Sequence, residues 1–313
     1  MYSYTVFMKV LMLSLLALVG YVCIKTKYIK KQTADDFAKI ITRIVVPALI
    51  ASVLLSSSMT VDKIKGSIWL YIVSIAYVLF MFGLSFIISK AAKTPKEEFP
   101  VLYFLMTFTN VIFMGLPVCI ALFGIECAFY VTVVATAQDT VLWTFGLIVL
   151  ARYSPKNAKT KIKINPITVA FILSLIIKLI GIPIPPIIEE PLKNIGGATS
   201  YLAMIYLGMI LSGAGLLSVI KKWRTYLYLF VKLIVYPLLA GLIAYKLLGG
   251  LFNLTQSGVF MVEFATGSAV ALSPVFKEYD INPELASGLT FIGTIMCLFT
   301  IPFVVWLSHI IYI

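Results

Sequence analysis

The sequence predicts an all-α polytopic membrane protein with ten transmembrane helices, arranged as two inverted five-helix repeats. Three observations predict this fold class. The 313 residues are 61% hydrophobic and only 12% charged, with a mean hydropathy of +1.04. Apolar stretches long enough to cross the roughly 30 Å hydrocarbon core follow one another with only short polar breaks. The longest basic segment divides these stretches five and five. The high hydrophobic and low charged content excludes an ordinary soluble domain.

The apolar stretches are bounded by charged residues or by Pro and Gly. We expect the first to remain as a helix rather than to be cleaved as a signal peptide, because no basic segment precedes it and the lysine cluster at 25–31 follows it. The ten expected spans are 5–24, 37–55, 67–89, 99–123, 128–151, 166–182, 198–217, 225–248, 257–281 and 285–310.

The net charge of +12 indicates a bilayer rather than a nucleic acid as the partner, because of where the basic residues lie. Alternate loops carry sixteen Lys and Arg residues on one side and four on the other. Basic loops stay in the cytoplasm. We therefore expect a multi-pass protein of the plasma or inner cell membrane with both termini outside.

Each half crosses the membrane an odd number of times, so any repeat must be inverted. The expected parts are a first repeat at 1–151, a basic cytoplasmic linker at 152–165 and a second repeat at 166–313. A shift of 157 residues aligns Pro117 with Pro274 and Thr109 with Thr266. Interrupted helices at matching positions of inverted repeats indicate the binding site of a secondary transporter.

The fourth and ninth spans are the predicted interrupted helices. Gly115 and Pro117 lie inside the fourth apolar run, and Gly267 and Pro274 lie inside the ninth. Because proline removes a backbone donor and clashes with the preceding turn, we expect each helix to break or unwind there. A simple kink is the alternative. At about 1.5 Å per residue both breaks lie near the midplane, where the positive end of each following half-helix favours an anionic ligand.

No feature of the sequence predicts an enzyme, a metal site or a cofactor. The four cysteines lie in or beside apolar spans without a C-x-x-C spacing, and His309 is the only histidine. A phosphate-binding Walker motif is also absent, which argues against direct ATP-driven pumping.

Two segments at these breaks resemble the auxin efflux carrier family. Residues 110–117 (Asn-Val-Ile-Phe-Met-Gly-Leu-Pro) are similar to its first crossover signature, and 274–283 are similar to the second crossover and the start of the last helix. The resemblance implies a crossover substrate site, an elevator-like transport unit from spans three to five and eight to ten, and a scaffold that forms homodimers. It also implies small organic anions as substrates, either auxin-like or similar to malate and malonate.

Asn110 is the first candidate for binding the anion, since the signature carries it and an amide at an unwound midplane can donate to a carboxylate. Capping of the helix break is its structural alternative. The other expected substrate-binding residues supply hydroxyls, bare backbone N–H groups or the breaks themselves: Thr109, Gly115, Pro117, Thr266, Gly267, Ser268 and Pro274.

Acidic residues inside membrane spans are costly and so indicate function. Asp139, preceded by Gln138, and Glu263 are the candidates for binding a coupling Na⁺ or H⁺. A structural hydrogen bond or ion pair is the alternative for each acid. The basic residues within spans are expected to reach the membrane interface with their long side chains: Lys9, Lys39, Arg43, Lys178 and Lys232. A countercharge for the anion is the alternative role of Arg43 and Lys178, but no spacing argument selects them.

These expectations together predict a secondary carrier of small organic anions that works by alternating access around the two crossovers. A sodium- or proton-coupled exchanger or symporter on a related inverted-repeat fold is the alternative.

Overall fold

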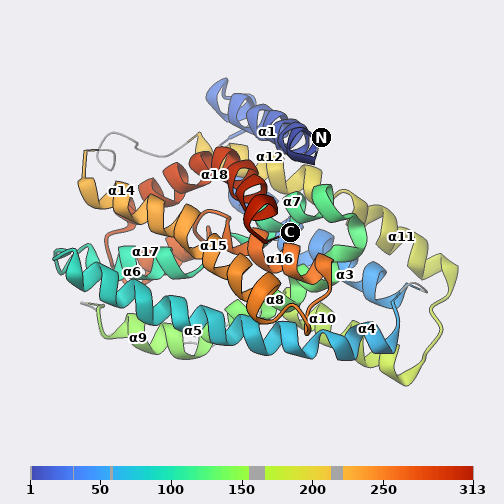
Figure 1. The fold of residues 1–313 in the computed structure, drawn as a ribbon. Helices are drawn as coiled ribbons and strands as arrows, with labels where there is room; N and C mark the ends of the chain where they lie inside the picture. The colour runs from blue at the N-terminus through green and yellow to red at the C-terminus, as the bar shows by residue number, and fades with distance from the viewer. Residues whose placement is uncertain (1, 31, 57–58, 155–165, 213–220, 313) are drawn as a thin grey trace.

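A computed structural model describes residues 2–30, 32–56, 59–154, 166–212 and 221–312 of the chain. These residues fold almost entirely as helices, and no β-strand occurs among them (Figure 1). The all-α fold class is therefore confirmed. The inverted orientation of the two halves in a membrane stays a prediction.

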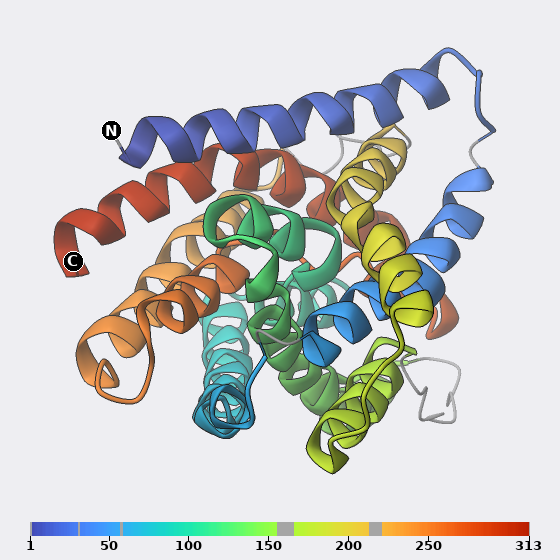
Figure 2. The same cartoon turned by 90° about the vertical axis from the view of Figure 1, so that its right-hand side faces the viewer.

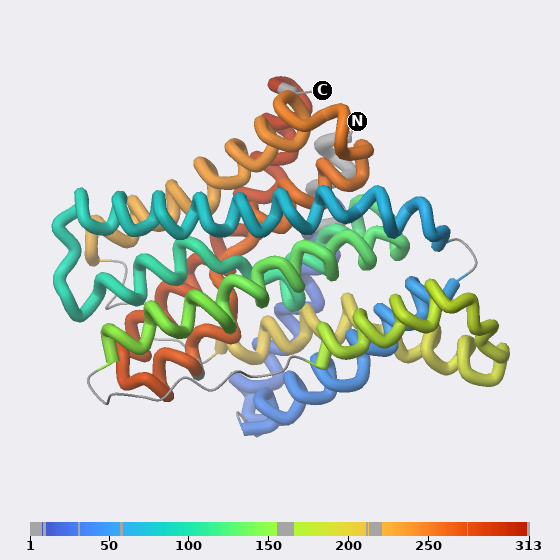
Figure 3. The backbone as a smooth tube through the Cα atoms, turned by 90° about the horizontal axis from the view of Figure 1, so that it is seen from below, coloured from blue at the N-terminus to red at the C-terminus, as the bar shows by residue number. Residues whose placement is uncertain are grey.

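Five helices in the described part of the chain are long and apolar enough to cross a membrane. They span Thr33–Leu55, Val61–Ala91, Ile125–Ala151, Trp223–Leu247 and Pro283–Ile311. Shorter apolar helices cover Leu11–Lys25, Val111–Phe123 and Pro166–Ile180. Figure 3 shows the long helices in the chain trace, seen from below. The number of ten spans stays a prediction.

The helices begin and end within a few residues of most of the expected spans. In the first half they are α1 (Tyr2–Lys25), α2 (Thr33–Ile40), η1 (Ile41–Val45), α3 (Val46–Leu55), α4 (Val61–Gly66), α5 (Ile68–Ala91), α6 (Phe99–Thr107), η2 (Val111–Gly115), α7 (Leu116–Phe123), η3 (Ile125–Cys127), α8 (Ala128–Val141), η4 (Leu142–Gly146) and α9 (Leu147–Ala151). In the second half they are α10 (Pro166–Ile180), α11 (Pro186–Gly197), α12 (Thr199–Leu211), α14 (Trp223–Phe230), η5 (Val231–Val235), α15 (Tyr236–Gly241), η6 (Leu242–Leu247), α16 (Leu254–Phe264), α17 (Leu272–Glu278) and α18 (Pro283–Tyr312). Most of the expected linker, residues 155–165, lies outside the described residues.

Three prolines inside the long helices follow a π-helical turn at the same spacing. The turns η1, η2 and η5 end at Val45, Gly115 and Val235, and Pro47, Pro117 and Pro237 stand two residues later. A proline ring clashes with the carbonyl group four residues earlier in a regular α-helix. A π-turn widens the helix locally. We infer that the widened turn lets each helix continue through its proline.

The packing of α1 against α12 depends on two glycines. A Cβ added to Gly20 would fall on the backbone carbonyl of Ile205, and one added to Gly208 would fall on that of Ala17. Small residues allow membrane helices to approach this closely. Figure 2 shows α1 lying along α18 as well, at the edge of the bundle.

The outer faces of the helices are apolar. Leu15 and Leu18 on α1, Ile87 on α5 and Phe299 on α18 are all more than half exposed. Soluble monomers rarely expose large apolar patches. These faces fit contact with lipid.

Candidate functional site

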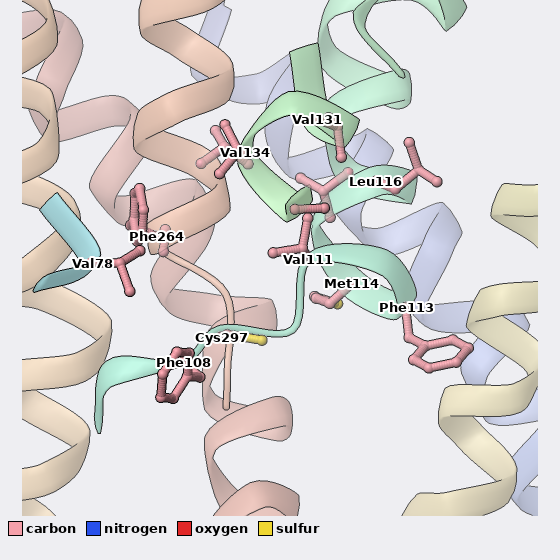
Figure 4. Packing of buried hydrophobic residues seen from close by; sticks show 14 of the residues in the cluster. Val78, Phe108, Val111, Phe113, Met114, Leu116, Val131, Val134, Phe264 and Cys297 are labelled. Atoms are coloured by element: carbon pink, nitrogen blue, oxygen red, sulfur yellow. The ribbon is translucent and has the colours of Figure 1, made fainter. Parts of the chain in front are cut away.

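Both expected helix breaks are present. The first separates α6, which ends at Thr107, from η2, which begins at Val111. The second separates α16, which ends at Phe264, from α17, which begins at Leu272. Figure 4 shows the chain without helix between Phe108 and Val111, close to the unwound segment that follows Phe264.

The two breaks are joined to each other by backbone hydrogen bonds. The amide of Asn110 donates to the carbonyl of Gly267 at 2.8 Å, and the amide of Ala269 donates to the carbonyl of Phe108 at 3.0 Å. Thr109 and Ser268 between them form an isolated antiparallel bridge. Unwound backbone needs such partners at membrane depth. The breaks therefore form one crossover.

The first break lies before Gly115 and Pro117, not at them. We expected unwinding around these two residues, but the π-turn η2 accommodates Pro117, and the helix is continuous from Val111 to Phe123. Gly115 has a different role. A Cβ at this position would overlap the carboxylate of Glu263, so the glycine makes room for that side chain.

Asn110 is buried at the crossover, with 3% of its surface exposed. Its backbone carbonyl accepts hydrogen bonds from Met114 and Gly115, but its side chain makes no capping bond to the following helix. Its Nδ2 atom has no hydrogen-bond partner among the described residues. An unpaired buried donor costs free energy unless a ligand or water completes it. The capping alternative is therefore not what the side chain does here.

Gln138 holds the first break in place. Its Oε1 accepts from the amide of Thr109 at 3.0 Å, and its Nε2 donates to the Oγ1 of Thr109 at 2.6 Å. Both ends of the amide are thus engaged with the crossover. Neighbouring Asp139 accepts at 3.3 Å from the indole nitrogen of Trp143, one turn later on the same helix.

Most of the site residues predicted at the second break form hydrogen bonds or close packing contacts within the protein. Thr266 donates to the carbonyl of Glu263 at 2.9 Å, and Ser268 donates to the carbonyl of Leu105 at 2.6 Å and pairs with the hydroxyl of Tyr228. A Cβ at Gly267 would come within 3.1 Å of the backbone of α18, so a glycine allows that helix to pack closely. Pro274 lies in the first turn of α17.

A cavity of about 350 Å³ lies beside the crossover. Four of the predicted site residues line it, and these are Thr109, Asn110, Gln138 and Asp139. The other predicted site residues are not among those that line it. The remaining walls come from α2 and η1, from α8 and η4, from α10 and from the unwound segment Ala269 to Ala271.

Two basic residues that line this cavity were not selected as site residues from the sequence. Lys39 and Arg43 lie four residues apart, and therefore on the same side of the α2–η1 helix. Lys39 pairs with Asp36 at 2.7 Å. Arg43 forms no ion pair with any described residue. The spacing was visible in the sequence, but only the fold brings this face to the crossover.

A larger cleft of about 1370 Å³ adjoins the cavity and shares six lining residues with it, among them Thr42, Phe113 and Val270. Lys25, Lys27 and Lys30, at the end of α1, also line the cleft. The cleft therefore leads from the basic loop to the crossover.

Glu263 is completely buried, and its carboxylate lies against Gly115 in η2. Its Oε1 accepts from the thiol of Cys119 at 3.3 Å, and its Oε2 has no partner among the described residues. No group of three or more metal-ligating side chains lies around it or elsewhere in the described chain.

The lysines inside the predicted spans lie in different environments. Lys178 donates to the carbonyl of Ser56 at 2.7 Å, which lies just past the end of α3. The expectation that Lys232 reaches the membrane interface is wrong: its side chain is fully buried and donates to the carbonyl of Met106 at 3.1 Å. The side chain of Lys9 lies outside the described residues.

The comparison with known protein families agrees with the apolar helical bundle and its crossover. No curated protein matches the chain in a sequence search. The family described as "Membrane transport protein", which is of the auxin efflux carrier type, matches residues 5–163 and 152–305, and so nearly the whole chain. The chain, an apolar helical bundle with a crossover of two broken helices, therefore belongs to the auxin efflux carrier-type membrane transport family.

Proposed function

We propose that this membrane transporter is a secondary carrier of small organic anions, and that the anion binds at the crossover beside Asn110. One observation carries the proposal: Asn110 lines a cavity, and its buried Nδ2 has no hydrogen-bond partner among the described residues. A donor kept unpaired in a cavity is suited to a ligand that accepts hydrogen bonds, such as a carboxylate.

The rest of the cavity favours a negative charge. Val111, Ile112 and Phe113 form the first turn of the helix that follows the break, and all three line the cavity. The first N–H groups of a helix have no partner within it, and the dipole there favours an anion. Arg43, in η1, adds a positive charge to the cavity wall. Phe108 and Trp143 supply apolar surface for the body of the ligand.

The size of the cavity agrees with a small substrate. A volume of about 350 Å³ lies near the lower end of the range for small-molecule sites. This supports simple carboxylates, auxin-like or similar to malate and malonate, as the substrate class.

The lining also supports an elevator-type mechanism of alternating access. The cavity lies between α2, η1 and α10, which belong to the expected scaffold, and the crossover and α8, which belong to the expected transport unit. A substrate at this boundary is exposed to a different side when one unit slides past the other. The cleft lined by Lys25, Lys27 and Lys30 is the proposed route to the basic side. Dimers through the scaffold belong to the same proposal.

Coupling to a cation is the second candidate function, as a sodium- or proton-coupled exchanger or symporter. Glu263 favours it, because a fully buried carboxylate with an unpartnered Oε2 is costly unless it binds a proton or a cation. Asp139 is the other candidate for the coupling ion.

Electrical recording from proteoliposomes tests the proposal. The reconstituted protein is challenged with a panel of carboxylates, while sodium and pH are varied independently. We expect carboxylate-dependent currents or exchange that vanish in empty liposomes. Transport of none of the panel, with purified and monodisperse protein, would contradict an organic-anion carrier. A dependence on sodium or on pH separates the two coupling ions.

A further inference from the structure

Lys232 lies deep in the span formed by α14, η5 and α15, and its side chain is fully buried. Among the described residues it forms no ion pair with a carboxylate. Among these residues its amine donates one hydrogen bond, to the carbonyl of Met106 at 3.1 Å. A buried lysine without a carboxylate partner is costly, so its position needs an explanation.

Met106 is in the last turn of α6, directly before the first break. The carbonyl groups of this turn have no partners within their own helix and carry the negative end of its dipole. Three of the carbonyl groups at this end of α6 are bonded by three different donors. Ser268 bonds Leu105, the amide of Ala269 bonds Phe108, and Lys232 bonds Met106. The side-chain amine of Lys232 thus lies at the negative end of a broken helix.

This is the place where transporters with broken helices bind their coupling cation. Carbonyl groups of unwound backbone and the C-terminal ends of half-helices coordinate Na⁺ in such proteins. In this protein the side-chain amine of Lys232 occupies the corresponding position at the end of α6. Glu263 does not neutralise it, since that carboxylate contacts Cys119 and the site of Gly115 on the other half-helix.

We propose that Lys232 is a built-in cation, whose ammonium group permanently fills the cation subsite at the end of α6. The carrier accordingly uses no sodium ion at this position. The inference rests on the proposed function as a carrier, but the experiment that tests it needs no transport substrate. A failure of the transport experiment and a failure of this proposal are therefore distinguishable.

The test is the melting temperature of purified protein in sodium, potassium, methylammonium and choline chloride at equal ionic strength. Lys232→Ala empties the subsite, so it should melt below wild type in choline and be restored by methylammonium or Na⁺. At ten times its Kd a rescuing cation should raise Tm by about 3 to 6 °C. Na⁺ and methylammonium should raise the Tm of Lys232→Ala, relative to choline, by more than they raise that of wild type.

Two further variants separate the charge from packing and from the hydrogen bond. Lys232→Met fills a similar volume without a charge, so no cation should restore it. Lys232→Gln keeps a neutral donor for Met106, and it serves the same test if the alanine variant does not fold. A glutamine variant with wild-type Tm in choline would overturn the proposal, because the hydrogen bond alone would then suffice. An equal response to Na⁺ in wild type and in the alanine variant, or no cation response of the alanine variant, would also overturn it.

Discussion

Replacing Asn110 by alanine tests the candidate site most directly, because the side chain is not needed for folding. Its Nδ2 has no partner among the described residues and its side chain does not cap the following helix. Asn110→Ala therefore removes no internal bond of that donor, and the backbone bond to Gly267 is independent of the side chain. We expect the variant to insert and to melt close to wild type.

The effect on binding follows from the hydrogen bond that is lost. A bond to a charged group contributes about 1.5 to 3 kcal/mol, and its loss should weaken anion binding roughly 10- to 150-fold. Asn110→Asp should bind more weakly than the alanine variant, because a carboxylate at low dielectric repels the anion. The measurement is equilibrium binding of the identified substrate to purified, monodisperse variants.

Gln138→Ala is the matched control. It removes two bonds that hold Thr109, so it should lower Tm as well as affinity. Equal affinity of wild type and both Asn110 variants would refute the reasoning and show that the anion does not bind at this crossover.

Four more outcomes are expected. Glu263→Gln and Asp139→Asn should alter the pH or sodium dependence of concentrative uptake more than counterflow exchange, and unchanged profiles in both variants would remove their coupling role. Gly115→Ala should alter the same pH or sodium dependence as Glu263→Gln, because the added methyl displaces that carboxylate; a wild-type profile would contradict this. Gly208→Val should lower Tm in a thermal unfolding assay by separating α1 from α12, and an unchanged Tm would disprove the close contact. A cysteine at Lys159 in a cysteine-free background should resist impermeant reagents in intact cells, and labelling would reverse the predicted orientation.

The sequence was sufficient for the helices and for the existence of the breaks, because hydropathy and the positions of Gly and Pro act locally. It did not locate the first break. Pro117 suggested a position near itself, but the segment that unwinds is the one that pairs with the second break, at Phe108 to Asn110. Pairing between distant segments leaves no local signal.

Side-chain environments were predictable only where they depend on the chain's own helix. The distance of Lys232 from a helix end predicted the wrong environment, because its amine bonds the carbonyl of Met106 at the end of α6. Arg43 and Lys39 face the crossover only because α2 and η1 pack there. In contrast, Asn110 was identified by its motif, and the fold places this residue in the wall of the cavity.

The bonds that join the two breaks have a consequence for the diversity of such carriers. They run between main-chain atoms of Asn110, Gly267, Phe108 and Ala269, so they do not require particular side chains at three of these four positions. Only Gly267 is constrained, by the close approach of α18. Side chains that face the cavity, apart from Gln138, can therefore change without breaking the bonds that join the two segments. A common ancestor with this joint could give rise to carriers of different anions by substitutions at the cavity wall alone.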